Sequence, residues 1–387
     1  MESIDKYVWY QEGPGVRKNQ YTLEGIKLLN VANLVDGKID LSTSDRYISK
    51  EEANGKYKHF LADEGDLVIA SSGIQVNYFD KKMGFIKKEH LPLCMNTSTI
   101  RFKVLDKNTT NIRYFMYFLK SDIFKRQLQK LITGSAQLNF GPSHLKKIKI
   151  NMPLLENQNK EVNELDKVQE IIDIREKQIE QLDELIKSQF VELFGNISEY
   201  ERLENYAVLI TKGASPKWQG INYQNDGTLF VTSENVREGF VDISKPKYLD
   251  NKINEILPRS ILKRDDILIN IVGASIGRAA KYDYDYLANI NQAVALVRTQ
   301  NINNIFLLTY LNSDGAIKMY DDMKKGGARE NLSLKNIADL RIPKASIELQ
   351  NQFAEFVKLI DKQKFEIQKS LEEMEKLQES LMNKYFG

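Results

Sequence analysis

The chain repeats part of its own sequence at a nearly constant distance, and this duplication limits the possible folds more than any other feature. Segment 192–195 (ELFG) resembles segment 384–387 (KYFG), 192 positions later. Running back from these endings, residues 136–195 and 328–387 correspond without a gap. Earlier blocks recur in the same order at offsets of 200 and 202, as loop insertions between two copies of one fold would produce. The sequence therefore predicts a tandem pseudo-repeat of globular unit, long helix, globular unit and long helix.

Each copy ends in a segment that is typical of a long helix. Residues 156–194 contain neither proline nor glycine. Apolar residues recur there at every seventh position, and the second copy repeats the spacing. These residues are Leu165, Ile172, Ile179, Ile186 and Leu193, and then Phe353, Ile360, Ile367, Met374 and Leu381. Sustained heptads indicate a coiled-coil seam. We expect the two helices to pack on each other in antiparallel orientation.

The globular parts combine short strand-like runs with helical segments. The expected strands cover residues 26–31, 66–70, 229–231, 267–272 and 293–298, and the expected helices cover residues 112–131 and 305–323. The predicted fold class is α+β, with two similar globular domains that two long helices separate and join. The predicted boundaries are 1–150 for domain 1, 151–195 for helix 1, 196–342 for domain 2 and 343–387 for helix 2.

Composition excludes several classes of protein. The single cysteine, Cys94, and only three histidines argue against a disulfide framework and against a Cys- or His-based metal centre. Cysteine usage fits a reducing, cytoplasmic setting. No apolar run approaches the roughly 18 residues of a membrane helix, and the first residues lack the pattern of a signal peptide. We therefore expect a cytoplasmic protein without a membrane partner.

Charge is unevenly distributed along the chain. The net charge of the whole chain is +2, but residues 1–150 carry +8 and residues 151–195 carry −6. Residues 196–343 carry +1 and residues 344–387 carry −1. The basic first block suggests a polyanionic partner, whereas the acidic segment suggests a solvated helix or a protein partner.

The common catalytic signatures are absent from the sequence. It has no P-loop, no HExxH zinc motif, no GxSxG elbow and no complete dinucleotide fingerprint. The eight prolines are never adjacent, which excludes the Pro-Pro catalytic loop of amino-methyltransferases. We expect a non-catalytic chain without a cofactor or metal of its own.

Each copy opens with a similar strand-and-turn segment and ends with a similar entry into its long helix. The openings are residues 25–37 and 227–236, and the second copy adds the GASIGR segment 273–278 and Asn291-Gln292. The helix entries read INMPLLENQ (150–158) and IPKASIELQ (342–350). In this tandem order the segments resemble the specificity (S) subunit of type I DNA restriction-modification enzymes, over nearly the whole chain.

This resemblance implies a non-catalytic reader of double-stranded DNA. Each globular domain would be a target-recognition domain for one half of a bipartite site. The long helices would set the spacer and dock two methyltransferase (modification) subunits, and restriction subunits would join that core. Adenine methylation with S-adenosylmethionine would belong to the methyltransferase partner, with base flipping to expose the adenine.

Candidate DNA-contacting residues are cations and amides in loops, because cations bind phosphates and Arg, Lys, Asn and Gln read base edges. The candidates in the first block are Arg17, Lys18, Gln20, Lys81, Lys82, Gln137 and Asn139. Those in the second block are Lys212, Lys217, Ser275, Arg278, Gln292, Arg329 and Asn331. Lysines of this kind are usually solvated surface, and Trp218 is compatible with either the core or an interface.

Two alternatives remain open from the sequence. A coiled-coil adaptor would bind protein partners without reading a DNA sequence, and the small net charge of the second domain favours it. A fused restriction or methylation enzyme would need a catalytic motif that the sequence lacks.

Overall fold

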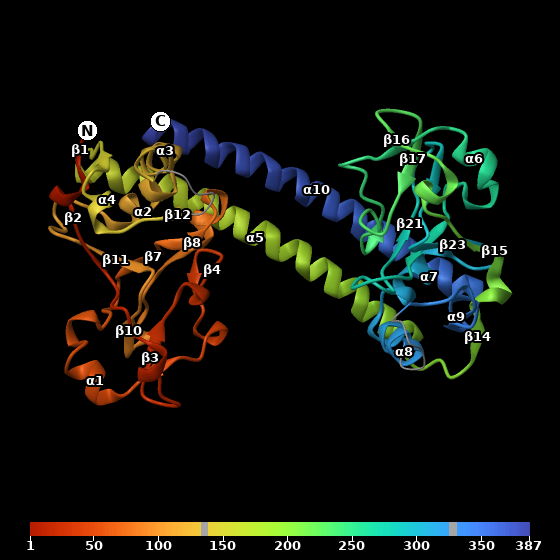
Figure 1. Cartoon of the computed structure of the whole chain (residues 1–387), viewed down its shortest axis with the longest axis horizontal. Coiled ribbons are helices and arrows are strands. Elements are labelled where there is room, and N and C mark those ends of the chain that lie inside the picture. The colour runs from red at the N-terminus through yellow and green to blue at the C-terminus, as the bar shows by residue number, and fades with distance from the viewer. Residues whose placement is uncertain (133–137, 325–330) are drawn as a thin grey trace. The chain divides into compact units, whose positions relative to one another are not determined.

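The computed structural model describes residues 1–132, 138–324 and 331–387, and divides the chain into two compact units. Unit 1 comprises Met1–Arg175 and Ser370–Gly387, and unit 2 comprises Glu176–Lys369 (Figure 1). Each unit therefore contains the start of one long helix and the end of another. The units divide the chain inside the long helices, so the domain boundaries at 150, 195 and 342 stay predictions.

Unit 1 has a four-stranded antiparallel sheet in the order β2-β11-β7-β9 and a three-stranded sheet in the order β10-β3-β6. In the smaller sheet β10 runs parallel to β3. Figure 1 shows α1 beside the smaller sheet and α2 to α4 on the other side of the larger one. The strands are β1 (Glu2–Ser3), β2 (Val8–Glu12), β3 (Ile26–Leu29), β4 (Leu34–Val35), β5 (Lys38–Ile39), β6 (Tyr47–Ile48), β7 (Leu67–Ala70), β8 (Ser72–Ile74), β9 (Met83–Phe85), β10 (Leu93–Met95), β11 (Thr99–Val104), β12 (Leu138–Asn139) and β13 (Lys149–Ile150). The short helices are α1 (Lys50–Asn54), α2 (Ile112–Lys120), α3 (Asp122–Leu131) and α4 (Pro142–Leu145).

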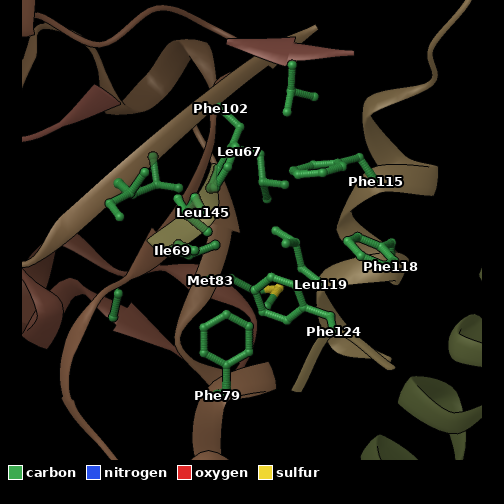
Figure 2. Packing of buried hydrophobic residues seen from close by; sticks show 14 of the residues in the cluster. Leu67, Ile69, Phe79, Met83, Phe102, Phe115, Phe118, Leu119, Phe124 and Leu145 are labelled. Carbon is green, nitrogen blue, oxygen red and sulfur yellow. The ribbon is translucent and has the colours of Figure 1, made fainter. Parts of the chain in front are cut away.

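The core of unit 1 lies between the larger sheet and helices α2 and α3. Figure 2 shows Leu67 and Phe102 from the sheet facing Phe115 and Phe118 from α2. All four residues of β7 are buried, since this central strand is covered on each face. Phe386, near the end of the chain, packs its ring 4.9 Å from that of Tyr114, so the C-terminal segment belongs to this core.

Unit 2 repeats the architecture of unit 1. Its larger sheet has the order β15-β23-β20-β21-β18 and its smaller sheet the order β16-β19-β17-β22, with β17 parallel to β22 as β3 is to β10. The strands are β14 (Tyr200–Arg202), β15 (Ala207–Lys212), β16 (Tyr223–Gln224), β17 (Thr228–Val231), β18 (Gly239–Phe240), β19 (Tyr248–Leu249), β20 (Ile267–Asn270), β21 (Ala279–Lys281), β22 (Ala288–Ile290), β23 (Val294–Thr299) and β24 (Arg341–Pro343). The short helices are α6 (Ile253–Ile256), α7 (Asn304–Leu311), α8 (Asp314–Lys324) and α9 (Leu334–Ala338). Phe194 packs here against Phe306 and Phe353, as Phe386 packs in unit 1.

The five predicted strands are confirmed, but each predicted helix in the globular parts is interrupted. The segment 112–131 breaks at Ser121, whose hydroxyl accepts a hydrogen bond from the backbone N–H of Phe124 and caps α3. The segment 305–323 breaks in the same way at Ser313, whose hydroxyl accepts from the N–H of Ala316. A serine that caps a new helix favours extended backbone at its own position, so the helix restarts there.

The two predicted long helices are present as α5 (Leu155–Phe194) and α10 (Ile347–Phe386), each with 40 residues. In unit 1, Tyr385 donates a hydrogen bond to Glu164, and Gln378 Nε2 donates to Gln169 Oε1 at 2.8 Å. Positions rise along α5 as they fall along α10, so these two segments run antiparallel within unit 1.

Heptad residues at the globular ends of these helices are buried, among them Leu165 and Phe353. Ile179 and Ile367 nearer the middle are only half-buried.

No helix in the described part of the chain is long and apolar enough to cross a membrane.

Candidate nucleic-acid interface

The loop that follows the first strand of each larger sheet has the same frame in the two units. Gly13 follows β2, and a Cβ atom at this position would lie 2.0 Å from the backbone oxygen of Asn96. Gly213 follows β15, and a Cβ atom there would lie 1.6 Å from the backbone oxygen of Ile290. Only glycine permits these approaches. Each loop is therefore pressed against the connection that leads into β11 or β23.

In unit 1 this loop carries three of the candidates. Two are cations with exposed side chains, and the third is a glutamine whose side chain is hydrogen-bonded within the unit. Arg17 and Lys18 are exposed at the short 3-10 helix Lys18–Gln20. Gln20 Nε2 donates to Glu52 Oε1 at 2.8 Å, and Gln20 Oε1 accepts from the N–H of Arg17 at 3.1 Å. Gln20 thus holds the loop against α1, and its amide is already hydrogen-bonded.

In unit 2 the equivalent loop carries the short 3-10 helix Pro216–Gln219. Lys217 is exposed at the position equivalent to Arg17, and Trp218 at the position equivalent to Lys18. Lys212 is exposed at the end of β15, where it pairs with Ala295 of β23.

A second loop of unit 2, residues 271–278, holds two further candidates. Asn270 Nδ2 donates to Ser275 Oγ at 2.9 Å, and the N–H of Asn270 donates to the backbone oxygen of Arg278 at 2.9 Å. Gly277 has a φ of +88°, and a Cβ there would lie 2.3 Å from the Tyr320 ring. The loop is closed tightly. The Arg278 side chain is half-buried and forms no ion pair within the described residues.

Neighbouring loops bring other candidates close to these residues. The N–H of Ile271 donates to the oxygen of Ala293 at 2.9 Å, next to the exposed Gln292. Asn331 forms a β-bridge with Val272. In unit 1, Asn139 pairs in the same way with Ser72. Two other candidates, Gln137 and Arg329, lie outside the described residues.

Lys81 and Lys82 contact a different segment of unit 1. Lys82 Nζ donates to the backbone oxygen of Leu34 at 2.8 Å, and Lys81 lies 3.5 Å from the carboxylate of Asp36. The Lys81 pair is exposed, so it adds little stability and leaves the lysine accessible. Lys82 is therefore partly committed to strand β4.

Asparagines that are buried in unit 1 and half-buried in unit 2 support the loops through hydrogen bonds, and they are not among the candidate DNA-contacting residues. In unit 1, Asn96 Nδ2 donates to Asn30 Oδ1 at 2.8 Å, and Asn33 Oδ1 accepts from the N–H of Asn30 at 2.9 Å. In unit 2, Asn235 Oδ1 accepts from the N–H of Thr232 at 2.9 Å. The signal was present in the repeat, because Asn33 and Asn235 are equivalent positions of the two opening segments.

An ion pair between an arginine and a buried aspartate also occurs in the larger sheet of each unit. Arg298 Nη2 and Nε lie 2.7 and 2.8 Å from the two oxygens of Asp266, and Arg101 Nη1 lies 3.1 Å from Asp66 Oδ2. Burial raises the pKa of the Asp66 carboxyl, against the opposing effects of Lys103 and Arg101. Each aspartate directly precedes one strand and its arginine lies on the adjacent antiparallel strand, so we assign the pair to the scaffold beneath the loops.

The arrangement suits binding to an extended anionic polymer. Exposed cations and amides stand on short, tightly closed loops above a rigid sheet. In the described segments, no three residues of the types His, Cys, Asp and Glu gather as ligands of a metal ion would.

Comparison with known proteins identifies the class. Residues 17–184 and 220–376 each match the family model of the type I restriction modification DNA specificity domain. The chain belongs to this family. The two matched regions correspond to the two copies of the internal repeat.

Individual relatives agree with the family match. The chain is 25% identical to the putative type I restriction enzyme MjaX specificity subunit of Methanocaldococcus jannaschii, covering 93% of this chain and 86% of that protein. It is 27% identical over 184 residues to the MjaVIII specificity subunit of the same organism. That match covers 48% of this chain and only 42% of the MjaVIII subunit.

Solved structures share the fold. The crystal structure of the type I restriction-modification S subunit from M. genitalium has a TM-score of 0.56 at 18% identity, covering 100% of this chain and 95% of that one. A chain from a structural study of complex assembly and conformational transition of the type I R-M system has a TM-score of 0.57 at 15% identity, with 98% and 97% coverage. At these identities the likeness concerns the fold.

Proposed function

We propose that this chain is the DNA sequence-recognition subunit of a type I restriction-modification system, in which each globular domain reads one half of a bipartite site. The observation that carries the proposal is that the same arrangement of loop and adjoining connection occurs in each of the two units. Gly13 and Gly213 press equivalent loops against equivalent connections, and each loop exposes a cation, Arg17 or Lys217. Two copies of one reading surface suit a site with two halves.

The candidate residues divide into two proposed roles. Arg17, Lys18, Lys212 and Lys217 are exposed cations, which bind phosphates and position a protein on DNA. Gln292 and Arg278 lie on linked loops and have side chains of the types that read base edges. Asn139 and Asn331, which pair with equivalent loops, belong to the same proposed surface.

The long helices have two further proposed roles. As an antiparallel coiled coil that joins the two units, they set the length of the unread spacer between the half-sites. They also dock the two methyltransferase subunits, because apolar side chains remain exposed on them. Ile174 on α5 is 48% exposed and Phe365 on α10 is 68% exposed. Further exposed apolar residues recur along each helix, among them Ile171 and Leu185 on α5 and Leu359 and Leu377 on α10. Groups of exposed apolar side chains mark protein contacts.

Catalysis is assigned to the partners. In this proposal S-adenosylmethionine binds the methyltransferase subunits, this chain has no cofactor of its own, and restriction subunits complete the assembly in the cytoplasm. The coiled-coil adaptor remains the second hypothesis, and the family match does not favour it.

The proposal is tested in two steps. The chain is co-purified with the methyltransferase subunit of the same system, and the methylated adenines of the host genome are then mapped. We expect a bipartite motif with a fixed gap that disappears when this chain is deleted. Methylation that is unchanged by the deletion would support the adaptor hypothesis instead. The variant Phe365→Glu should weaken co-purification, whereas Lys362→Glu, at an exposed position of the same helix, should not.

A further inference from the structure

Trp218 is the most exposed aromatic side chain of unit 2 within the described residues. Its relative exposure is 87%, which excludes a place in the core. The other tryptophan of the chain, Trp9, is 39% exposed and lies beneath the guanidinium of Arg101, 5.2 Å from the ring centre. Trp218 has no such cover in the described structure.

The turn that carries Trp218 is fixed although its ring is free. Pro216, the first residue of this turn and two positions before Trp218, is buried, and the N–H of Ile221 donates to the oxygen of Pro216 at 3.0 Å. Ile221 is itself buried in a cluster with Phe230 and Leu249. Gly220 ends the turn with a φ of +69°, a conformation that glycine adopts without strain. The exposed ring therefore stands on a rigid support.

The equivalent loop of unit 1 has the same support and different exposed residues. Val16 is buried where Pro216 is buried, and Tyr21 packs against the same cluster as Val16. Between these supports, unit 1 exposes Arg17-Lys18-Asn19, and unit 2 presents Lys217-Trp218-Gln219. The supports are retained and the presented triplet differs. Two domains that read different half-sites would need this combination.

We propose that the indole of Trp218 packs on a base or deoxyribose of the half-site that unit 2 reads, while Lys217 contacts the neighbouring phosphate. This inference rests on the proposed function. On a duplex, an aromatic ring binds through apolar contact with a base or sugar, or by wedging between base steps, and this involves no counterion release, whereas a lysine on a phosphate releases counterions. The two neighbouring residues therefore contribute to affinity with different dependence on salt.

The difference in salt dependence gives the test. The full chain, reconstituted with its methyltransferase, is titrated with a duplex carrying the mapped bipartite motif at several salt concentrations. Trp218→Ala should weaken binding by roughly tenfold at every salt concentration, with the slope of log Kd against log salt unchanged. Lys217→Ala should reduce the magnitude of that slope by about one, and Lys18→Ala in unit 1 should do the same.

Matched variants and duplexes separate the outcomes. Trp218→Phe should retain most of the affinity because it keeps an aromatic face. Trp218→Ala should not weaken binding to a duplex with a scrambled unit 2 half-site, whereas it should weaken binding to the intact duplex. Wild-type affinity of Trp218→Ala for the intact duplex would overturn the inference, as would loss of methyltransferase binding by this variant, which would place the ring at a protein interface. Equal binding of the wild-type complex to intact and fully scrambled duplexes would instead refute the proposed function.

Discussion

The side-chain oxygen of Gln158 accepts a hydrogen bond from the backbone N–H of Asn111 at 2.8 Å, although the two residues are 47 positions apart. Gln158 Nε2 donates to the backbone oxygens of Thr109 and Pro153 at 2.9 and 2.7 Å. Gln350 repeats the first contact in unit 2, where its Oε1 accepts from the N–H of Asn303 at 2.9 Å. In each unit, one buried glutamine fastens the start of a long helix to the globular part.

Replacing Gln158 with leucine should destabilise unit 1 by about 3 kcal/mol. The side chain is fully buried, and its removal would leave one N–H and two carbonyl groups without their partner. Chemical denaturation of the full chain measures the loss. Asn157→Leu is the matched control, since residue 157 is exposed on the same turn, and its stability should stay within about 0.5 kcal/mol of wild type. A small effect of Gln158→Leu would show that the glutamine is not the fastening element.

Alanine substitutions at two glycines of the unit 1 loop, only two positions apart, should have different effects on stability and DNA binding. An alanine Cβ at Gly13 would lie 2.0 Å from the oxygen of Asn96, whereas nothing lies within 4 Å of a Cβ at Gly15. Gly13→Ala must displace backbone, so we expect a loss of about 2 kcal/mol and weaker DNA binding. Gly15→Ala should be neutral or stabilising by up to about 1 kcal/mol, because it restricts the unfolded chain. Thermal unfolding and DNA titration of the two variants decide the matter, and equal behaviour would contradict the described packing.

Cys94 should be unreactive in the native protein. Burial raises the pKa of its thiol to about 12, so the reactive thiolate is rare at pH 8. An alkylating reagent should modify the full chain only when unit 1 unfolds, which makes the rate of labelling a measure of its stability. Cys94→Ala provides the blank, as the chain has no other cysteine. Rapid labelling without denaturant would contradict the buried position.

The raised pKa of the Cys94 thiol predicts that the free energy of unfolding decreases at alkaline pH. The unfolded thiol has a pKa of roughly 8.5, below that of the folded state. The folded state therefore retains its proton over a range in which the unfolded state loses one. This contribution is complete below about pH 8.5 and is lost as the pH rises toward 12. Denaturation of wild type and Cys94→Ala between pH 8 and 10 should show a steeper decline for wild type.

The sequence predicted those features that depend on periodicity and repetition. The heptads predicted the two long helices, because a seam such as Leu165 and Ile172 needs only local spacing. Spacing alone does not predict the break at Ser121, because the apolar pattern continues through this serine and its role as a cap depends on the chain turning there. Asp183 illustrates another limit: i,i+4 spacing alone would pair it with Lys187, but Asp183 pairs with Lys364 of α10 at 2.5 Å.

The candidate site could be predicted by residue type more readily than by geometry. Arg17 and Lys217 were selected as loop cations, and the structure exposes them on equivalent turns. Gln20 was selected by the same reasoning, yet its amide holds the loop to Glu52. Whether a polar side chain is free or already hydrogen-bonded depends on tertiary contacts that a single sequence does not contain.

The spacer of the recognised site should change with the length of the long helices. Seven residues inserted after Arg175 and seven after Lys369 lie where the chain passes between the compact units, and they preserve the heptad phase. Such an insertion adds about 10 Å to each helix. Mapping of methylated adenines should then show unchanged half-sites and a longer gap, because the loops that read bases are untouched. Three-residue insertions at the same places break the heptad phase and should lower stability without giving a defined new gap. Altered half-site sequences after the seven-residue insertions would refute the proposed role of the helices as a spacer.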